Sequence, residues 1–74
     1  MNVPATQKWA YKILRMNQVI EITGLGRSTI YNLMDSKSKY YDPNFPKAIK
    51  LTDSATGWLE SEINRWIELK IASR

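Results

Sequence analysis

The chain has 74 residues, with 11 Lys and Arg, 7 Asp and Glu and neither Cys nor His, so its formal net charge is +4. The lack of Cys and His excludes disulfides, thiol and imidazole catalysis and nearly every transition-metal site. A chain this short buries only roughly 60–65% of the surface that its unfolded state exposes, which leaves little room for a deep catalytic cavity.

The first ten residues, MNVPATQKWA, are expected to form a flexible arm ahead of a single domain over residues 11–74. Trp9 and Tyr11 are expected to mark where packing begins. The arm lacks the charged start, apolar run and cleavage site of a signal peptide, and no stretch approaches the ~18 consecutive apolar residues of a membrane span. We therefore expect a cytoplasmic protein without membrane contact.

A short strand over residues 11–16 and a first short helix are predicted next. Asn17 is a suitable N-cap for this helix because its side-chain oxygen can accept a backbone N–H. Gly24 can end the helix with a positive φ, and Leu25 is expected to enter the core. The apolar side chains of the helix are Val19, Ile20 and Ile22.

A second helix is predicted to begin near Gly26 and Arg27. Its apolar residues follow an i, i+3, i+4 spacing, which places them on one buried stripe. They are Ile30, Leu33 and Met34. The remaining faces are polar and can form hydrogen bonds, and they carry Arg27, Ser28, Thr29, Tyr31 and Asn32.

The second half of the chain predicts a loop, a β-hairpin and a last helix. Pro, Asn, Asp and Ser dominate residues 36–46, which is typical of a loop. Residues 47–52 and 56–60 predict two strands that form a wing, with Ile49, Leu51 and Trp58 on one face. The residues of the wing that are expected to project toward a ligand are Lys47, Lys50 and Thr52. Residues 60–73 predict an amphipathic helix whose apolar stripe includes Ile63, Trp66, Ile67 and Ile71.

The positive charge is unevenly distributed. Residues 8–50 hold eight basic and three acidic residues, whereas residues 51–74 hold three basic and four acidic residues. This asymmetry favours a polyanion partner on one face, and the alternative is a basic surface without a partner.

Two short helices joined by TGLG fit the helix-turn-helix scheme, in which the second helix presents donors to phosphates and base edges. Arg27 can fork onto a guanine or bind a phosphate, and Asn32 can pair with adenine. Ser28 and Thr29 lie where the helix N-terminus attracts anions. Tyr31 can contact a sugar or a thymine methyl group.

Each of these residues also has a purely structural interpretation. Arg27 can be a solvated charge, Thr29 can hydrogen-bond the turn, and Tyr31 can pack on Tyr40 or Tyr41. Lys47 and Lys50 can bind phosphates, or they can be edge-strand lysines that discourage aggregation.

Three runs in the same order resemble the AlpA family of small phage and prophage regulators: ILRMNQVIEITGLGRSTIYNLM, FPKAIKL and GWLESEINRWI. The resemblance implies a mostly α-helical winged helix-turn-helix with a small β-hairpin, similar in plan to excisionases and MerR-type domains. It maps the recognition helix onto residues 27–32 and the wing onto residues 47–58. Gly26 stands where the family usually has Ser, the loop is longer than usual, and Asp53 and Ser54 occupy the wing tip.

The resemblance implies a nucleoid-associated, sequence-specific binder of double-stranded DNA from a prophage or genomic island. It would act as a transcriptional regulator or as a recombination directionality factor beside a tyrosine-type integrase. Because one recognition helix seldom gives sufficient specificity, we expect cooperative binding as a dimer or a row of monomers. The alternative is a module that docks on integrase or RNA polymerase through Tyr40, Tyr41 and Phe45.

An enzyme is disfavoured, because no Ser–Lys pair or paired acids show a catalytic spacing. No cofactor is expected. RNA binding is disfavoured because Trp58 and Trp66 lie on apolar stripes and not on an open stacking surface.

Overall fold

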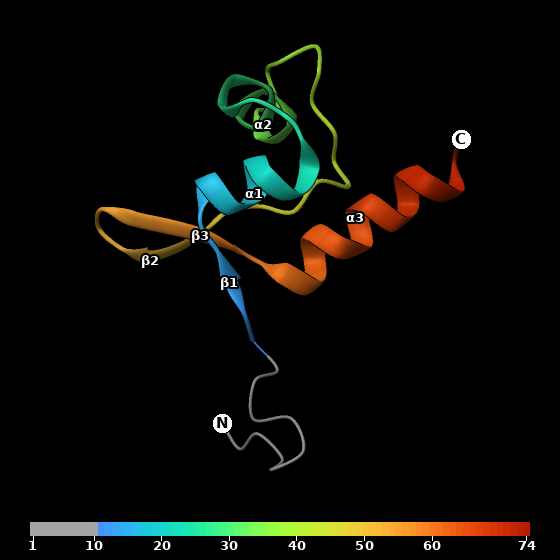
Figure 1. Ribbon diagram of the computed structural model, residues 1–74. Helices are drawn as coiled ribbons and strands as arrows, with labels where there is room; N and C mark the ends of the chain where they lie inside the picture. The colour runs from blue at the N-terminus through green and yellow to red at the C-terminus, as the bar shows by residue number, and fades with distance from the viewer. Residues whose placement is uncertain (1–10) are drawn as a thin grey trace.

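The computed structural model describes residues 11–74, so the predicted arm over residues 1–10, with Trp9, lies outside the described residues. The elements are β1 (Ile13–Leu14), α1 (Met16–Thr23), α2 (Arg27–Met34), β2 (Ile49–Thr52), β3 (Ala55–Leu59) and α3 (Glu60–Ala72). The β2–β3 hairpin extends to one side of the α1–α2 pair and α3 extends to the other (Figure 1). The predicted fold class is confirmed: this is a small winged helix-turn-helix, and the β2–β3 hairpin is its wing.

The helix α1 begins two residues earlier than predicted, at Met16 and not at Gln18. Its N-cap is Arg15, whose backbone N–H donates to Gln18 Oε1 at 2.9 Å. The prediction of Asn17 as the cap is therefore wrong, because Gln18 supplies the bond and Asn17 is already helical. The predicted end is confirmed: Gly24 has φ 73° and its N–H donates to Ile20 O at 2.8 Å.

The turn between α1 and α2 is held by Thr23. Its hydroxyl donates to Val19 O at 2.7 Å and accepts from Leu25 N–H at 3.2 Å. Leu25 is half-buried and packs against the core, as predicted. Gly26 is the N-cap of α2 with φ −76° and ψ 164°, and it offers no side-chain oxygen to the helix.

The strands form one antiparallel sheet in the order β1-β3-β2. Leu14 pairs with Trp58, and Lys50 pairs with Thr56. A Cβ on Gly57 would overlap Ile13 Cγ2 and lie 3.0 Å from Leu14 O. A glycine is therefore needed here because β1 comes too close for a side chain.

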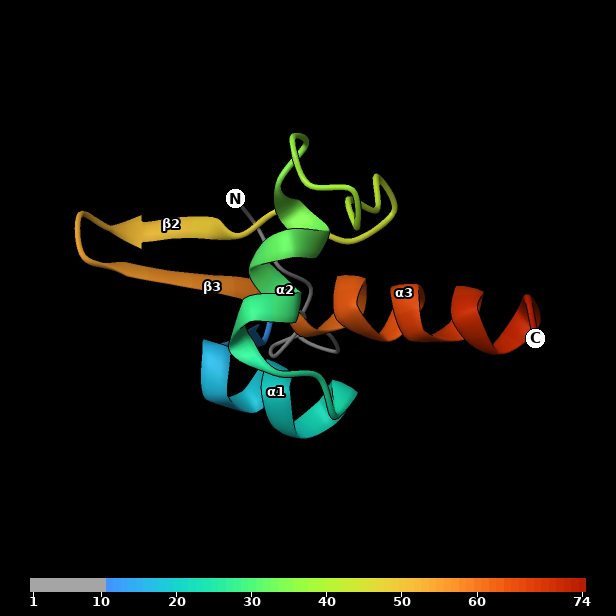
Figure 2. The same cartoon turned by 90° about the horizontal axis from the view of Figure 1, so that it is seen from above.

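Each element contributes at least one side chain to a single core, except β2. The buried core residues are Leu14, Val19, Ile30, Phe45, Trp58, Ile63 and Trp66. The predicted core roles of Ile30, Trp58, Ile63 and Trp66 are confirmed. Ile22, Leu51 and Ile71 belong to the predicted apolar faces, but all three are exposed. The wing and the end of α3 extend away from the rest of the fold (Figure 2).

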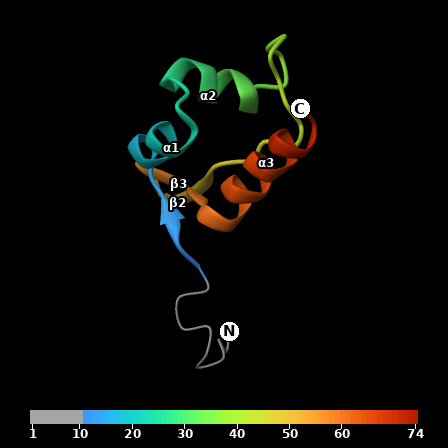
Figure 3. The same ribbon diagram turned by 45° about the vertical axis from the view of Figure 1, so that its right-hand side comes forward.

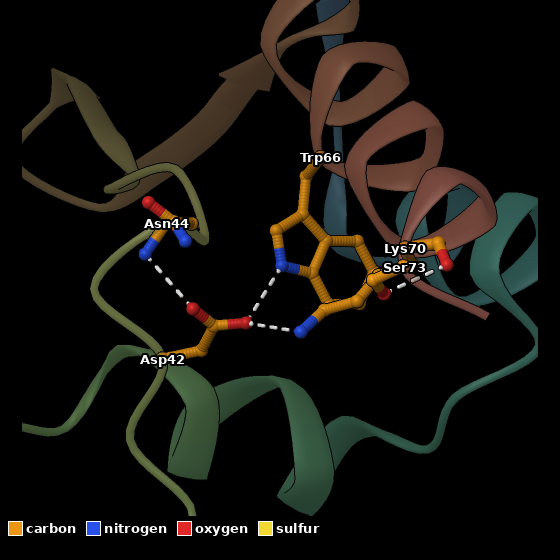
Figure 4. A network of polar contacts seen from close by, with 5 residues as sticks. All are labelled: Asp42, Asn44, Trp66, Lys70 and Ser73. Carbon is orange, nitrogen blue, oxygen red and sulfur yellow. Dashed lines mark hydrogen bonds and ion pairs between the residues drawn. The ribbon is translucent and has the colours of Figure 1, made fainter.

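The predicted loop is confirmed. It contacts α3 through the side chain of Asp42. Asp42 Oδ2 accepts from Trp66 Nε1 at 3.0 Å and lies 2.9 Å from Lys70 Nζ, while Oδ1 accepts from Asn44 N–H at 2.9 Å (Figure 4). The Trp66 indole N–H, and then the hydrogen bond from Lys70, lower the pKa of the Asp42 carboxyl. Asp42 therefore fixes the loop to α3.

Phe45 lies in the core and not on a docking surface. It is 4% exposed and meets the Trp66 ring edge-to-face, with ring centroids 5.0 Å apart. The prediction that Phe45 belongs to a docking surface with Tyr40 and Tyr41 is therefore wrong. Tyr40 and Tyr41 themselves are exposed.

Candidate nucleic-acid interface

The outward face of α2 is open and polar. Arg27, Ser28 and Thr29 are exposed in its first turn, Tyr31 is 53% exposed, and Asn32 is half-buried. The exposure follows from the helix period, because only Ile30 points fully into the core. In Figure 3, α2 lies across the top of the molecule with α1 and α3 below it.

The wing carries two of its three predicted contact residues. Lys50 and Thr52 lie on β2 and are exposed. Lys50 Nζ is 4.0 Å from Asp53 Oδ1, a pair too exposed to hold the lysine in place. Lys47 precedes β2 and lines a hollow against Glu62 and Arg65 of α3. The structure thus groups Lys50 and Thr52 on the hairpin and places Lys47 at its base.

A polar hollow of about 270 Å³ lies where the start of α1, the first turns of α2 and the wing meet. It is lined by Met16 and by six polar or basic side chains: Arg15, Asn17, Arg27, Tyr31, Ser54 and Thr56. Arg27 Nη2 donates to Asn17 Oδ1 at 3.4 Å, which links the two helices across the hollow. The hollow joins α2 to the wing in one surface.

The hollow is electropositive. Its lining contains two arginines and no carboxylate, and neither Arg15 nor Arg27 forms an ion pair with any residue between 11 and 74. By contrast, Lys12 pairs with Glu60 at 3.4 Å and Lys70 with Asp42 at 2.9 Å. Uncompensated cations gathered in one concavity attract an anionic ligand.

Sequence reasoning missed four polar members of this surface: Arg15, Asn17, Ser54 and Thr56. From the sequence, Arg15 contributed only to the excess of positive charge, and Asn17 was predicted only as a helix N-cap. Pairing of β3 with both β1 and β2 brings the wing beside the start of α1, and no local pattern shows that pairing. The basic residue directly before the first helix was the one available signal.

Other kinds of site find no support in the part of the chain that the structure describes. Between residues 11 and 74 no group of three or more carboxylates, His or Cys could hold a metal ion. No helix among these residues is both long and apolar enough to cross a membrane.

A family model described as "Prophage CP4-57 regulatory protein (AlpA)" matches residues 12–71. The chain belongs to the AlpA family. It is 45% identical over 58 residues to the "DNA-binding transcriptional activator AlpA" of Escherichia coli (strain K12), covering 78% of this chain and 83% of that protein. It is 35% identical over 63 residues to the "Uncharacterized protein ORF88" of Enterobacteria phage P4, covering 85% of this chain and 65% of that protein. No solved structure matches the chain at a significant level.

The comparisons confirm the resemblance stated from the sequence. The match to the AlpA family begins just before β1 and ends within the last turn of α3. It therefore spans the helix-turn-helix, the wing and the polar hollow together.

Proposed function

We propose that the chain binds double-stranded DNA sequence-specifically, with α2 in the major groove and the wing on the adjacent backbone. The observation that carries the proposal is the open polar face of α2, continuous with an electropositive hollow and the wing. The 45% identity to a protein named as a DNA-binding transcriptional activator supports it. The chain then acts as a regulator without enzymatic activity or cofactor.

The base-reading residues are Ser28, Thr29, Tyr31 and Asn32, and Lys50 and Thr52 contact the backbone. The test is electrophoretic titration at low salt against the promoter and attachment-site DNA of the chain's own mobile element. Asn32→Ala should relax preference at one base pair by ~1–3 kcal/mol. Asn64→Ala, an exposed Asn on α3, is the matched control and should change nothing. Wild-type protein that binds no duplex at low salt contradicts the proposal.

The biological role that we propose is regulation of a prophage or genomic island, as an activator or repressor or as a recombination directionality factor. These roles differ in partner: RNA polymerase for the first, a tyrosine-type integrase for the last. Tyr40 and Tyr41 are exposed beside α2 and offer an aromatic contact. A complex with purified integrase or polymerase should survive moderate salt and be lost in Tyr40→Ser. A complex unaffected by Tyr40→Ser argues against this contact.

We further propose that copies bind DNA cooperatively, as a row. An apolar hollow of about 330 Å³ between the end of α1 and the second half of α3 is lined by Ile22, Leu25, Ile67 and Ile71, with Lys70 and Arg74 at its rim. A neighbour's wing fits it, because the wing exposes apolar Leu51 and the carboxylate of Asp53. The wing and α3 point in opposite directions, so the contact repeats head to tail (Figures 1 and 2).

Sedimentation on a long multi-site duplex tests the row. Ile71→Ser should reduce cooperativity without weakening binding to a single site. Leu69→Ser removes a similarly exposed side chain from outside this hollow and should leave cooperativity intact. One protomer per long duplex at saturation, or equal effects of the two substitutions, contradicts this contact.

A further inference from the structure

The direction of the Arg27 side chain bears on which part of DNA it can contact, a guanine or a phosphate. An arginine that reads guanine presents both terminal N–H groups to the O6 and N7 atoms from the outer face of the helix. Arg27, at the first position of α2, instead turns back toward α1, where its Nη2 meets Asn17 Oδ1 at 3.4 Å. Its guanidinium therefore lines the hollow between helices and wing.

Arg15 lines the same hollow from the start of α1. Its backbone is fixed as the helix cap, because its N–H donates to Gln18 Oε1 and its carbonyl accepts from Val19 N–H at 3.0 Å. Ser54 and Thr56 line the hollow from the wing and add two hydroxyl groups to it. Two guanidiniums and two hydroxyls without a carboxylate supply the positive charge and the hydrogen-bond donors that a phosphate group binds.

We propose that Arg15 and Arg27 together bind one phosphate of the DNA backbone, and that Asn17 is a positioning residue that orients Arg27. The inference rests on the proposed function. The DNA-binding surface then has two parts. The hollow fixes the register of the protein on DNA, and the outward side chains of α2 read the bases.

The first test uses the full chain and a duplex that it selects from a randomised pool. Arg27→Ala should weaken every sequence alike. Because Arg15 still binds the same phosphate, Arg27→Ala should flatten the salt slope by less than one phosphate contact. The double variant Arg15→Ala/Arg27→Ala should flatten it by one contact, so that its loss of affinity between 50 and 200 mM salt is about 3.5-fold smaller than that of the wild type. A guanine contact would instead cost about 5- to 150-fold in discrimination at one base pair. That outcome would overturn the inference.

The second test replaces single backbone phosphates of the selected duplex with uncharged methylphosphonates. At one position, the methylphosphonate should weaken the binding of the wild type to the duplex. The same replacement should not further weaken the binding of Arg15→Ala or of Arg27→Ala. If the two variants respond to different phosphates, or to none, the proposal is wrong. Arg65→Ala, an exposed arginine on α3, is the control and should keep the wild-type pattern.

Asn17→Ala tests the positioning role. It should weaken binding in the wild type and have no effect in the Arg27→Ala background, since it acts through that guanidinium. Additive losses contradict this role. If the wild type selects no duplex at all, the proposed function fails. If it selects one but Arg27 reads a base, only this inference fails.

Discussion

Replacing Asp42 with Asn should loosen the loop from α3. The side chain is only 13% exposed, and Oδ2 receives both the Trp66 indole N–H and the Lys70 ammonium. The substitution leaves one oxygen for Asn44 N–H and places an amide group against two donors. A lost hydrogen bond to a charged group costs ~1.5–3 kcal/mol, and the half-exposed Lys70 pair adds at most ~1 kcal/mol. Because both bonds use one oxygen, we expect a loss of about 2 kcal/mol.

The assay is urea unfolding followed by circular dichroism at neutral pH, with Lys70→Met as the control. Lys70→Met removes the ion pair and keeps the bond from Trp66, so it should cost less than ~1 kcal/mol. For a domain of this size, the loss in Asp42→Asn corresponds to a fall in Tm of roughly 8–16 °C. A loss below ~0.5 kcal/mol, or one equal to that of Lys70→Met, would refute the reasoning.

The same variant predicts a pH dependence. The Trp66 indole N–H, followed by the hydrogen bond from Lys70, lowers the pKa of Asp42 in the folded state. The carboxylate therefore stabilises the fold fully above its unfolded pKa of ~3.9, and this stabilisation is lost as the pH falls through the folded pKa. The gap in unfolding free energy between wild type and Asp42→Asn should be constant near neutrality and narrow below about pH 4. A gap that widens in acid contradicts this account.

Three glycines give further predictions, each measurable by urea unfolding. Gly57→Ala should destabilise the fold by ~1–3 kcal/mol, because its Cβ would overlap Ile13 Cγ2. Gly24→Ala should cost ~1–2 kcal/mol because φ is +73° there, although nothing lies within 4 Å of the added Cβ. Gly26→Ser should stabilise by a few tenths of a kcal/mol, since the extended backbone of this N-cap suits a serine and the site is open. A destabilising Gly26→Ser or a neutral Gly57→Ala would contradict these geometries.

The helix α2 could be predicted from the sequence because its signals are local. The spacing of Ile30, Leu33 and Met34 fixes which face is buried, and Gly24 fixes where the preceding helix ends.

The cap of α1 was missed because two nearby polar side chains compete for it. Asn17 is a good cap by type, but Gln18 reaches back to the Arg15 N–H and starts the helix earlier.

The composite part of the candidate site could not be predicted, because it depends on long-range pairing. Thr56 reaches the hollow because β3 pairs with β2, and Arg15 does so because β1 pairs with β3. Phe45 was misplaced for a related reason. The turn residues of the loop do not indicate that Asp42 accepts a hydrogen bond from α3. They also do not indicate that Phe45, the next aromatic residue, packs against Trp66 in the core.

The position of α2 depends on contacts at both of its ends. With eight residues and one fully buried side chain, α2 is too short to be stable alone. Its start is set by the Thr23–Leu25 turn, and near its end Leu33 O accepts from Asp42 N–H at 3.0 Å. The Asp42 side chain is held by α3, so Asp42 connects the end of α2 to α3 in addition to the core contact of Ile30. If α2 reads bases as we propose, Asp42→Asn should weaken specific binding more than nonspecific binding.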